Sequence, residues 1–455
     1  MKQIVLPLAL ILAGCTGGPV SEAPARRVAL PSTLPPMKTF AQTTPRNSLK
    51  SNAVLAQDFL DLSFKMESGR TLPILTRFEG PISVRAVGKA PASFSTDLTA
   101  LLARLRKEAG LDIKTTKSGD STANITIQTI PRSELQSYVP QAACFVVPRI
   151  SSWTEYKQQR RTRNVDWVTL KKREKVAIFM PSDVAPQELR DCLHEELAQA
   201  MGPLNDLYRL PDSVFNDDNF HAVLTGFDML MLRVYYAPEL KNGMTKAQVA
   251  SQLPGILARL NPRGNRASEQ VVSRTPRAWI DSIETALGPK TSMAARQVAA
   301  RRAVRIAESQ RWYDSRYAFS LFALGRLTLG TDPEISLASF LQAGHIYSKG
   351  RDTQLQAAHV AMQMSAFALT SGQAGDVIAL VDKNIKAVAE AENASLLATM
   401  LMLKAEALEI QGRKKEAAAV RLDSLGWARY GFGSERDVRG RLSEIASLTP
   451  RGSRS

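Results

Sequence analysis

The sequence predicts a mixed α+β domain followed by an all-α helical-repeat domain. Between about residues 51 and 262, short segments of alternating apolar residues are separated by segments with helical periodicity. From about residue 277 to residue 447 the chain is rich in Ala and Leu, and its pattern is almost purely helical. There the breakers Gly330, Gly372 and Gly412 recur at spacings of 42 and 40 residues, which is typical of stacked helical hairpins.

The first fifteen residues, MKQIVLPLALILAGC, have the pattern of an export signal. Lys2 precedes an apolar run from Ile4 to Leu12 that is too short to span a bilayer as a stable helix. Residues 12–15, Leu-Ala-Gly-Cys, resemble the lipobox of bacterial lipoproteins. The resemblance implies cleavage before Cys15, diacylglycerol on its sulfur and an acylated amino group, which together anchor a protein stably in a membrane. The alternative is a soluble exported protein with a chance cysteine.

Thr16 follows the lipobox cysteine. By the same resemblance, an aspartate there would favour the inner membrane, so the outer membrane is preferred and the chain is expected to face the periplasm. Residues 16–50 are rich in Pro, Ser, Thr and Ala and predict a semi-extended tether. The expected organisation is therefore signal 1–15, tether 16–50, α+β domain 51–262 and helical domain 263–455.

The α+β domain is expected to begin with a strand, a helix and two further strands, followed by a second helix. The alternating or continuous apolar segments predict strands at 82–88, 123–130 and 175–181. The first helix starts near Ser95 and stops at Gly110, and the second has Pro186 in its first turn and Gly202 as its stop. A further amphipathic helix is expected at 246–260.

The helix before Gly202 contains HEELAQAMGPLND, residues 194–206, which suggests a metal-binding helix. Zinc hydrolases place two ligands four residues apart, with a glutamate beside the first as general base. With His194 as the first ligand, Ala198 occupies the second position, so this register fails. Counting back from Gly202 along the longer zinc motif places Glu195 and Gln199 at the two ligand positions.

In this second register Glu196 keeps the general-base position, and Asn205 or Asp206 occupies the third ligand position. The segment that follows contains Ser213-Val214-Phe215, then Leu224-Thr225, Asp228 and Tyr236. In this order these residues resemble the metzincin peptidases, especially the matrixin branch. The resemblance covers roughly residues 75–245, and it implies a metzincin-like fold with Phe215 in place of the methionine of the turn below the metal. The chain also resembles an uncharacterised family of bacterial envelope proteins.

The donors available to such a site are poor for zinc. The chain has four histidines, of which only His194 and His221 lie in the α+β domain. Carboxamides are weak ligands, and zinc is held mostly by Cys, His and Asp or Glu. Oxygen donors suit a harder ion such as Ca²⁺. A rearranged zinc site with His194, His221 and Asp206 and an ordinary amphipathic helix without a site both remain open.

The two cysteines besides Cys15 are Cys144 and Cys192. In an oxidising envelope they are expected to form one disulfide, which closes a separation of 48 residues and contributes ~3–4 kcal/mol through loop-closure entropy. Two buried free thiols are the alternative.

The net charge of +16 is concentrated in part between Lys157 and Lys175. The basic residues of this segment are Lys157, Arg160, Arg161, Arg163, Lys171, Lys172, Arg173 and Lys175. Anionic lipid, lipopolysaccharide or an acidic partner fits an exported protein better than nucleic acid does. A solvated strand edge is the alternative.

The helical domain resembles tetratricopeptide repeats in one segment, residues 401–420, where Ala405, Gly412 and Ala417 follow the repeat pattern. Helical solenoids present surfaces for peptides or proteins. Trp312, Tyr313 and Tyr317 are candidates for such a surface or for packing between helices.

The function expected from these patterns is a lipid-anchored scaffold that binds an envelope protein or peptide, with a degenerate and inactive metallopeptidase-like domain. No cofactor is expected in that case. The alternative is an active zinc-dependent peptidase with a non-standard ligand set and Glu196 as base. The sequence contains no glycine-rich phosphate loop and no nucleophile elbow.

Overall fold

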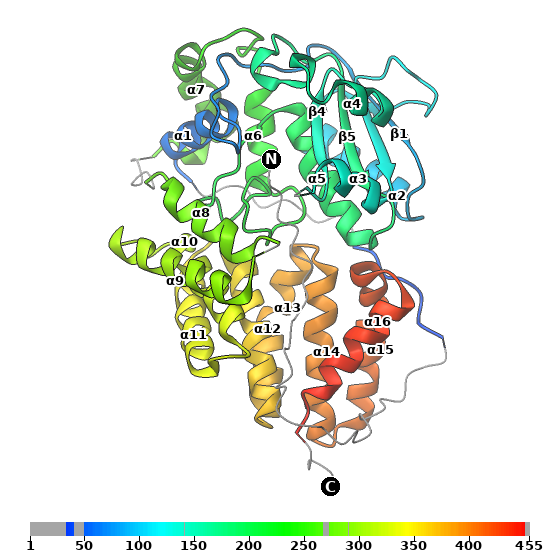
Figure 1. Cartoon of the computed structure of the whole chain (residues 1–455), viewed down its shortest axis with the longest axis vertical. Coiled ribbons are helices and arrows are strands. Elements are labelled where there is room, and N and C mark those ends of the chain that lie inside the picture. The colour runs from blue at the N-terminus through cyan, green and yellow to red at the C-terminus, as the bar shows by residue number, and fades with distance from the viewer. Residues whose placement is uncertain (1–32, 41–49, 141, 267–272, 290, 451–455) are drawn as a thin grey trace. The chain divides into compact units, whose positions relative to one another are not determined.

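The computed structural model describes residues 33–40, 50–140, 142–266, 273–289 and 291–450 (Figure 1). The expected signal, the lipobox cysteine and most of the expected tether fall on residues 1–32 and 41–49, which lie outside the described residues. The chain divides into two compact units at Arg274 and Thr275. The first combines a sheet with helices and the second is helical, as the sequence predicts. No helix in the described part of the chain is long and apolar enough to cross a bilayer.

The first unit is built on a five-stranded sheet of order β2-β1-β3-β5-β4. The strands are β1 (Ile82–Val87), β2 (Ile113–Thr115), β3 (Ile125–Ile130), β4 (Phe145–Pro148) and β5 (Val176–Pro181). All neighbouring pairs are parallel except the edge strand β4, which is antiparallel to β5. Every residue of β5 is buried, which explains its continuous apolar sequence, because a strand covered on both faces needs no polar side.

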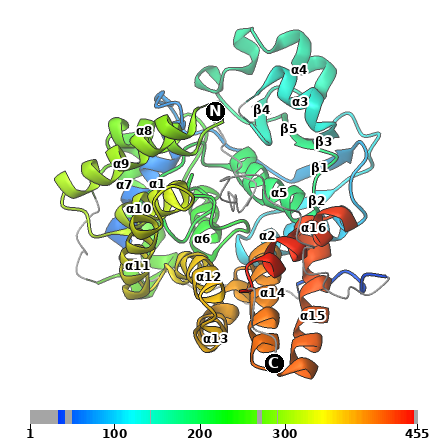
Figure 2. The ribbon, with the colours of Figure 1, turned by 60° about the horizontal axis from the view of Figure 1, so that its bottom comes forward.

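Helices cover both faces of this sheet (Figure 2). They are α1 (Asn52–Ser63), α2 (Phe94–Glu108), α3 (Arg132–Tyr138), α4 (Trp153–Gln159), α5 (Pro186–Met201), α6 (Gly226–Tyr235) and α7 (Lys246–Leu260). Ile178 and Met180 of β5 join the larger core with α1, α2, α5, α6 and α7. Ala177 and Phe179 point to the other face, where α3 and α4 supply Leu135 and Trp153.

Cys144 and Cys192 form the expected disulfide. It connects the residue before β4 to the middle of α5, so the edge strand and the candidate helix are covalently joined.

The second unit consists of helices in which each packs against the next along the chain (Figure 1). They are α8 (Arg277–Leu287), α9 (Met293–Ser309), α10 (Ser315–Thr328), α11 (Pro333–Lys349), α12 (Gln354–Thr370), α13 (Ala374–Glu390), α14 (Ala394–Ile410), α15 (Lys414–Phe432) and α16 (Glu435–Ser447). Gly372 and Gly412 adopt positive φ after α12 and α14, where glycine has no steric penalty. Trp312 and Tyr317 are buried, whereas Tyr313 is 83% exposed.

Residues 33–40 of the expected tether pack on α15 of the second unit. The Lys38 amide donates to the Gly426 carbonyl at 3.0 Å, and the Arg429 guanidinium donates to the Pro35 carbonyl at 2.8 Å. The Phe40 ring stacks on Trp427 with centroids 4.5 Å apart. This part of the tether is therefore docked on the helical unit.

Candidate functional site

Helix α5 is fixed at its C-terminal end by a buried arginine. The Arg173 guanidinium donates to the carbonyls of Gln199, Ala200 and Gly202 at 2.6, 2.7 and 2.5 Å. These carbonyls belong to the end of the helix, where the last turn has no partners inside the helix. Arg173 belongs to the basic segment that the sequence suggested as an anionic-surface site, but it is only 3% exposed and orients α5 instead.

His194 is buried and neutral. Its Nδ1 accepts a hydrogen bond from the Leu224 amide at 3.1 Å, and burial lowers its pKa well below the usual value. Because that lone pair is occupied, His194 is a structural link between α5 and the segment before α6. Burial also lowers the pKa of His221, to about 4.

Beside α5 lies a group of carboxyls, here called the acid cluster: Glu67, Asp191, Glu195, Glu196, Asp206 and Asp217. Burial raises the pKa of Glu195 well above its usual value, and the charges of Glu196, Glu67, Asp217 and Asp191 raise it further. The pKa of Asp206 is likewise raised well above its usual value, first by burial and then by the charges of Glu67, Asp217 and Glu195.

Three residues expected at ligand positions therefore meet at this cluster. Gln199 donates from Nε2 to Oε1 of Glu67 at 3.4 Å, while Glu195 and Asp206 interact electrostatically. Glu67 was missed by the sequence analysis because it lies in the loop after α1, far away along the chain and within no motif. Glu195 is half-buried, whereas Glu196, the candidate base, is 0% exposed.

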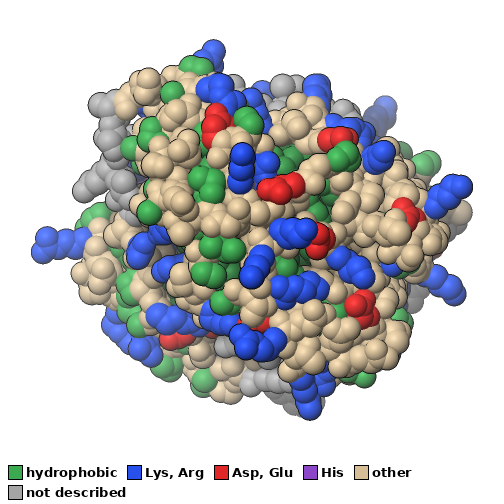
Figure 3. Space-filling model, turned by 90° about the horizontal axis from the view of Figure 1, so that it is seen from above, with side chains coloured by type: hydrophobic (Ala, Val, Ile, Leu, Met, Phe, Trp, Pro, Cys, Tyr) green, Lys and Arg blue, Asp and Glu red, His purple; other side chains and the backbone are tan. Residues whose placement is uncertain are grey.

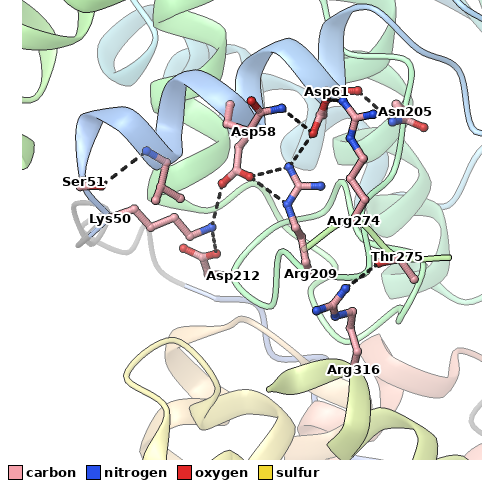
Figure 4. Close-up of polar contacts among 12 residues, drawn as sticks. Lys50, Ser51, Asp58, Asp61, Asn205, Arg209, Asp212, Arg274, Thr275 and Arg316 are labelled. Atoms are coloured by element: carbon pink, nitrogen blue, oxygen red, sulfur yellow. Dashed lines mark hydrogen bonds and ion pairs between the residues drawn. The ribbon is translucent and has the colours of Figure 1, made fainter. Parts of the chain in front are cut away.

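Asn205, a candidate for the third ligand position, forms a structural hydrogen bond instead of joining the acid cluster. Its Nδ2 donates to the carbonyl of Asp61 in α1 at 2.9 Å, so its amide nitrogen anchors the loop that follows α5. The same loop is held by Arg209, which lies between Asp58 and Asp61 (Figure 4). Distances from its Nη2 are 2.8 Å to Asp58 and 3.1 Å to Asp61.

Lys50 extends this ion network. Its ammonium lies 3.6 Å from Asp58 and 3.1 Å from Asp212 (Figure 4). The loop between α5 and α6 is thus connected to α1 on both sides of Asp206. This network fixes the position from which Asp206 enters the acid cluster.

The turn Ser213–Phe215 is buried and is fixed by Asp228 of α6. The Asp228 carboxylate accepts from the Ser213 hydroxyl at 2.5 Å and from the Val214 amide at 3.2 Å. It also accepts from the Thr225 amide at 2.7 Å, as part of a capping box at the start of α6. Burial raises the pKa of Asp228 to about 6, against the lowering effect of these hydrogen bonds. Phe215 is completely buried, and its carbonyl accepts from the Leu207 amide at 2.9 Å.

The donor set does not fit zinc. Glu195 and Asp206 supply oxygen, Gln199 supplies a carboxamide, and His194 uses Nδ1 as a structural acceptor. Within the described ranges, no three His, Cys, Asp or Glu side chains are placed to hold a metal ion together. What the cluster offers is carboxyls that keep their protons to a higher pH, which can donate hydrogen bonds or receive a cationic group.

The basic segment is only partly available for a partner. Lys157 pairs with Glu134 and Lys172 with Glu174. The exposed basic residues of the segment are Arg161, Arg163, Lys171 and Lys172. Figure 3 shows one face of the protein on which Lys and Arg side chains outnumber Asp and Glu.

The chain matches no curated protein and no solved structure. A family model does match part of the first unit, from the start of α1 into α7. Residues 52–255 are thereby similar to DUF2927, a family described as proteins of unknown function.

Proposed function

We propose that the chain is a lipid-anchored protein of the bacterial cell envelope that binds a peptide or protein partner through a metzincin-like domain without catalytic metal. The observation that carries the proposal is the buried turn Ser213–Phe215 after α5, which Asp228 holds by hydrogen bonds. It supports the resemblance to metzincins, in which Glu195 and Gln199 would stand where a zinc peptidase needs imidazoles.

The arrangement of elements supports the metzincin-like part of this proposal. Helix α5 follows the inner strand β5, the turn Ser213–Phe215 follows α5, and α6 provides Asp228, which holds the turn. The edge strand β4 is antiparallel to an otherwise parallel sheet. A metzincin-like domain would use such a sheet edge and the face of α5 to receive an extended peptide.

The acid cluster supports binding of a basic group. Glu195 and Asp206 are half-buried, and the charges of neighbouring carboxylates raise the pKa of both residues, so an amine or guanidinium placed beside them would relieve this repulsion. Glu196 is completely buried, which favours a structural role over activation of water for this side chain. The second unit would supply a further protein-binding surface, and acylated Cys15 would supply the membrane anchor.

The proposal is tested with two variants of the chain in a deletion strain. Glu196→Gln removes the candidate base and should complement fully if the domain binds without cleaving. Asp217→Lys reverses a half-buried charge of the acid cluster and should abolish complementation while the protein remains folded by circular dichroism. Glu174→Gln, an exposed carboxylate outside the cluster, is the matched control.

Metal content separates the proposal from its alternative. The chain expressed from Thr16 is purified from an oxidising compartment without chelator and submitted to elemental analysis. Less than about one tenth of a zinc per chain is expected. About one zinc per chain that is lost in Glu195→Gln, together with failure of Glu196→Gln to complement, would instead establish a zinc-dependent hydrolase.

A further inference from the structure

Two arginines of the helical unit lie at the same end of the helical hairpin formed by α9 and α10. Arg296 is in the first turn of α9, and Arg326 is in the last turn of α10. Gln297 donates from Nε2 to the carbonyl of Leu327 at 2.8 Å, so the residues that follow the two arginines are directly hydrogen-bonded. This contact places the two arginine positions at the same corner of the packed pair α9 and α10, close enough for the charge of Arg296 to affect Arg326.

Neither arginine has an acidic partner among the residues that the structure describes. Nε of Arg296 donates to the Ala286 carbonyl at the end of α8, at 2.8 Å. The Arg326 guanidinium lies 5.9 Å from the centre of the Phe322 ring. Throughout the described part of the chain, no carboxylate is within ion-pairing distance of either side chain.

Other arginines removed from solvent in this protein have carboxylate or carbonyl partners. The carboxylate pairs are Arg104 with Glu108, Arg209 with Asp58 and Asp61, Arg316 with Asp314, Arg421 with Glu406 and Glu409, and Arg441 with Glu444. Arg173 donates to three carbonyls. Arg326 departs from this pattern, because it has neither a carboxylate nor a carbonyl partner among the described residues. Burial and, to a smaller extent, the charge of Arg296 lower its pKa to about 10.

A half-buried guanidinium beside a second one is unfavourable when no anion is present. At a pKa of about 10 Arg326 still carries its charge at neutral pH, so the two positive charges repel each other. The arrangement is favourable once an anion lies between them, because each guanidinium can donate two parallel hydrogen bonds to an oxyanion. The first turn of α9 adds the positive end of the helix dipole at the same corner.

We propose that Arg296 and Arg326 form a binding site for an oxyanion, a carboxylate or a phosphate group. The site lies wholly within the second unit and requires none of the acid cluster. The alternative is a purely structural role, in which Arg326 only stabilises the C-terminal end of α10 through the helix dipole.

The two interpretations predict opposite effects of neutralising Arg326. Unfolding of the chain expressed from Thr16 is followed in chloride, acetate and phosphate at equal ionic strength. In chloride, Arg326→Met should raise the midpoint of the helical unit, because the repulsion is removed. Phosphate or acetate should raise the midpoint of the wild type, and Arg326→Met should weaken that anion's apparent affinity roughly tenfold or more.

Arg296→Met is the second variant and should behave in the same way. Arg302→Met, an exposed arginine of the same helix, is the matched control and should change neither quantity. The anion that gives the larger shift identifies the ligand as carboxylate or phosphate. A lower midpoint of Arg326→Met in chloride, or equal anion effects in wild type and both variants, would overturn the proposal.

Discussion

Glu195 and Asp206 owe their unusual chemistry to neighbours that are distant along the chain. Glu67, from the loop after α1, is a main electrostatic neighbour of both residues and also receives the Gln199 amide. Glu195 and Gln199 of α5, both expected at ligand positions, therefore already interact with Glu67. A partner that enters the cluster would need to exchange these contacts for its own.

The acid cluster should make the first unit less stable as pH rises. The pKa of Glu195 is raised in the folded chain by burial and by neighbouring carboxylates. Its stabilising contribution is full below the usual pKa and is lost as pH rises through the folded pKa, because the folded form holds a proton that the unfolded form releases. Hydrogen exchange of peptides covering α5 should show protection falling over the pH interval between the usual pKa of a glutamate and the raised pKa of Glu195.

Glu195→Gln should reduce this fall, since the amide does not ionise. Glu174→Gln, which changes an exposed carboxylate, should leave it unchanged. Protection that is constant over the same interval in the wild type would show that a counter-charge is bound within the cluster.

At the scale of elements, the periodicity of apolar residues along the chain was sufficient to predict the longer strands of the sheet. The alternating segments at 82–88 and 123–130 and the apolar segment at 175–181 are β1, β3 and β5. Strand β2 was missed because it has three residues, two of them exposed, and β4 because its four residues end in proline. For the site, the motif around α5 indicated the positions of Glu195, Gln199 and Asp206. It indicated neither Glu67 nor the role of Asn205 as an anchor, because both depend on tertiary contacts between distant parts of the chain.

Helices α14 and α15 approach each other closely at a glycine. A Cβ on Gly431 would lie 2.7 Å from the backbone nitrogen of Ser395, whereas a Cβ on Gly440 of α16 would meet nothing within 4 Å. Gly431→Ala should therefore destabilise the helical unit by about 1–3 kcal/mol through overpacking. Gly440→Ala should stabilise it by about 0.5–1 kcal/mol, because alanine favours an open helical position. Chemical denaturation checks both, and equal effects would contradict the close approach.

At the scale of the whole molecule, docking of residues 33–40 on α15 should protect them from proteases. Trp427→Ala removes the stacking of Phe40, which is worth about 0.5–1.5 kcal/mol, and should make tryptic cleavage after Lys38 roughly twofold to tenfold faster. Limited proteolysis with mass spectrometry measures this rate. Tyr313→Ala, at an exposed aromatic, is the control, and unchanged cleavage in Trp427→Ala would show that the stacking does not hold the segment.

If Cys15 is acylated as proposed, the docked segment would also limit how far the protein can extend from a membrane. Between Cys15 and the first described residue, Thr33, lie the seventeen residues 16–32, which can span at most about 60 Å however they are arranged. The docked segment of the helical unit would then stay within about that distance of the membrane that holds Cys15. Partners embedded in the same membrane, or attached to it, would meet the helical unit at a high effective concentration. The Trp427→Ala variant would release residues 33–40, lengthen the free tether and so lower that effective concentration.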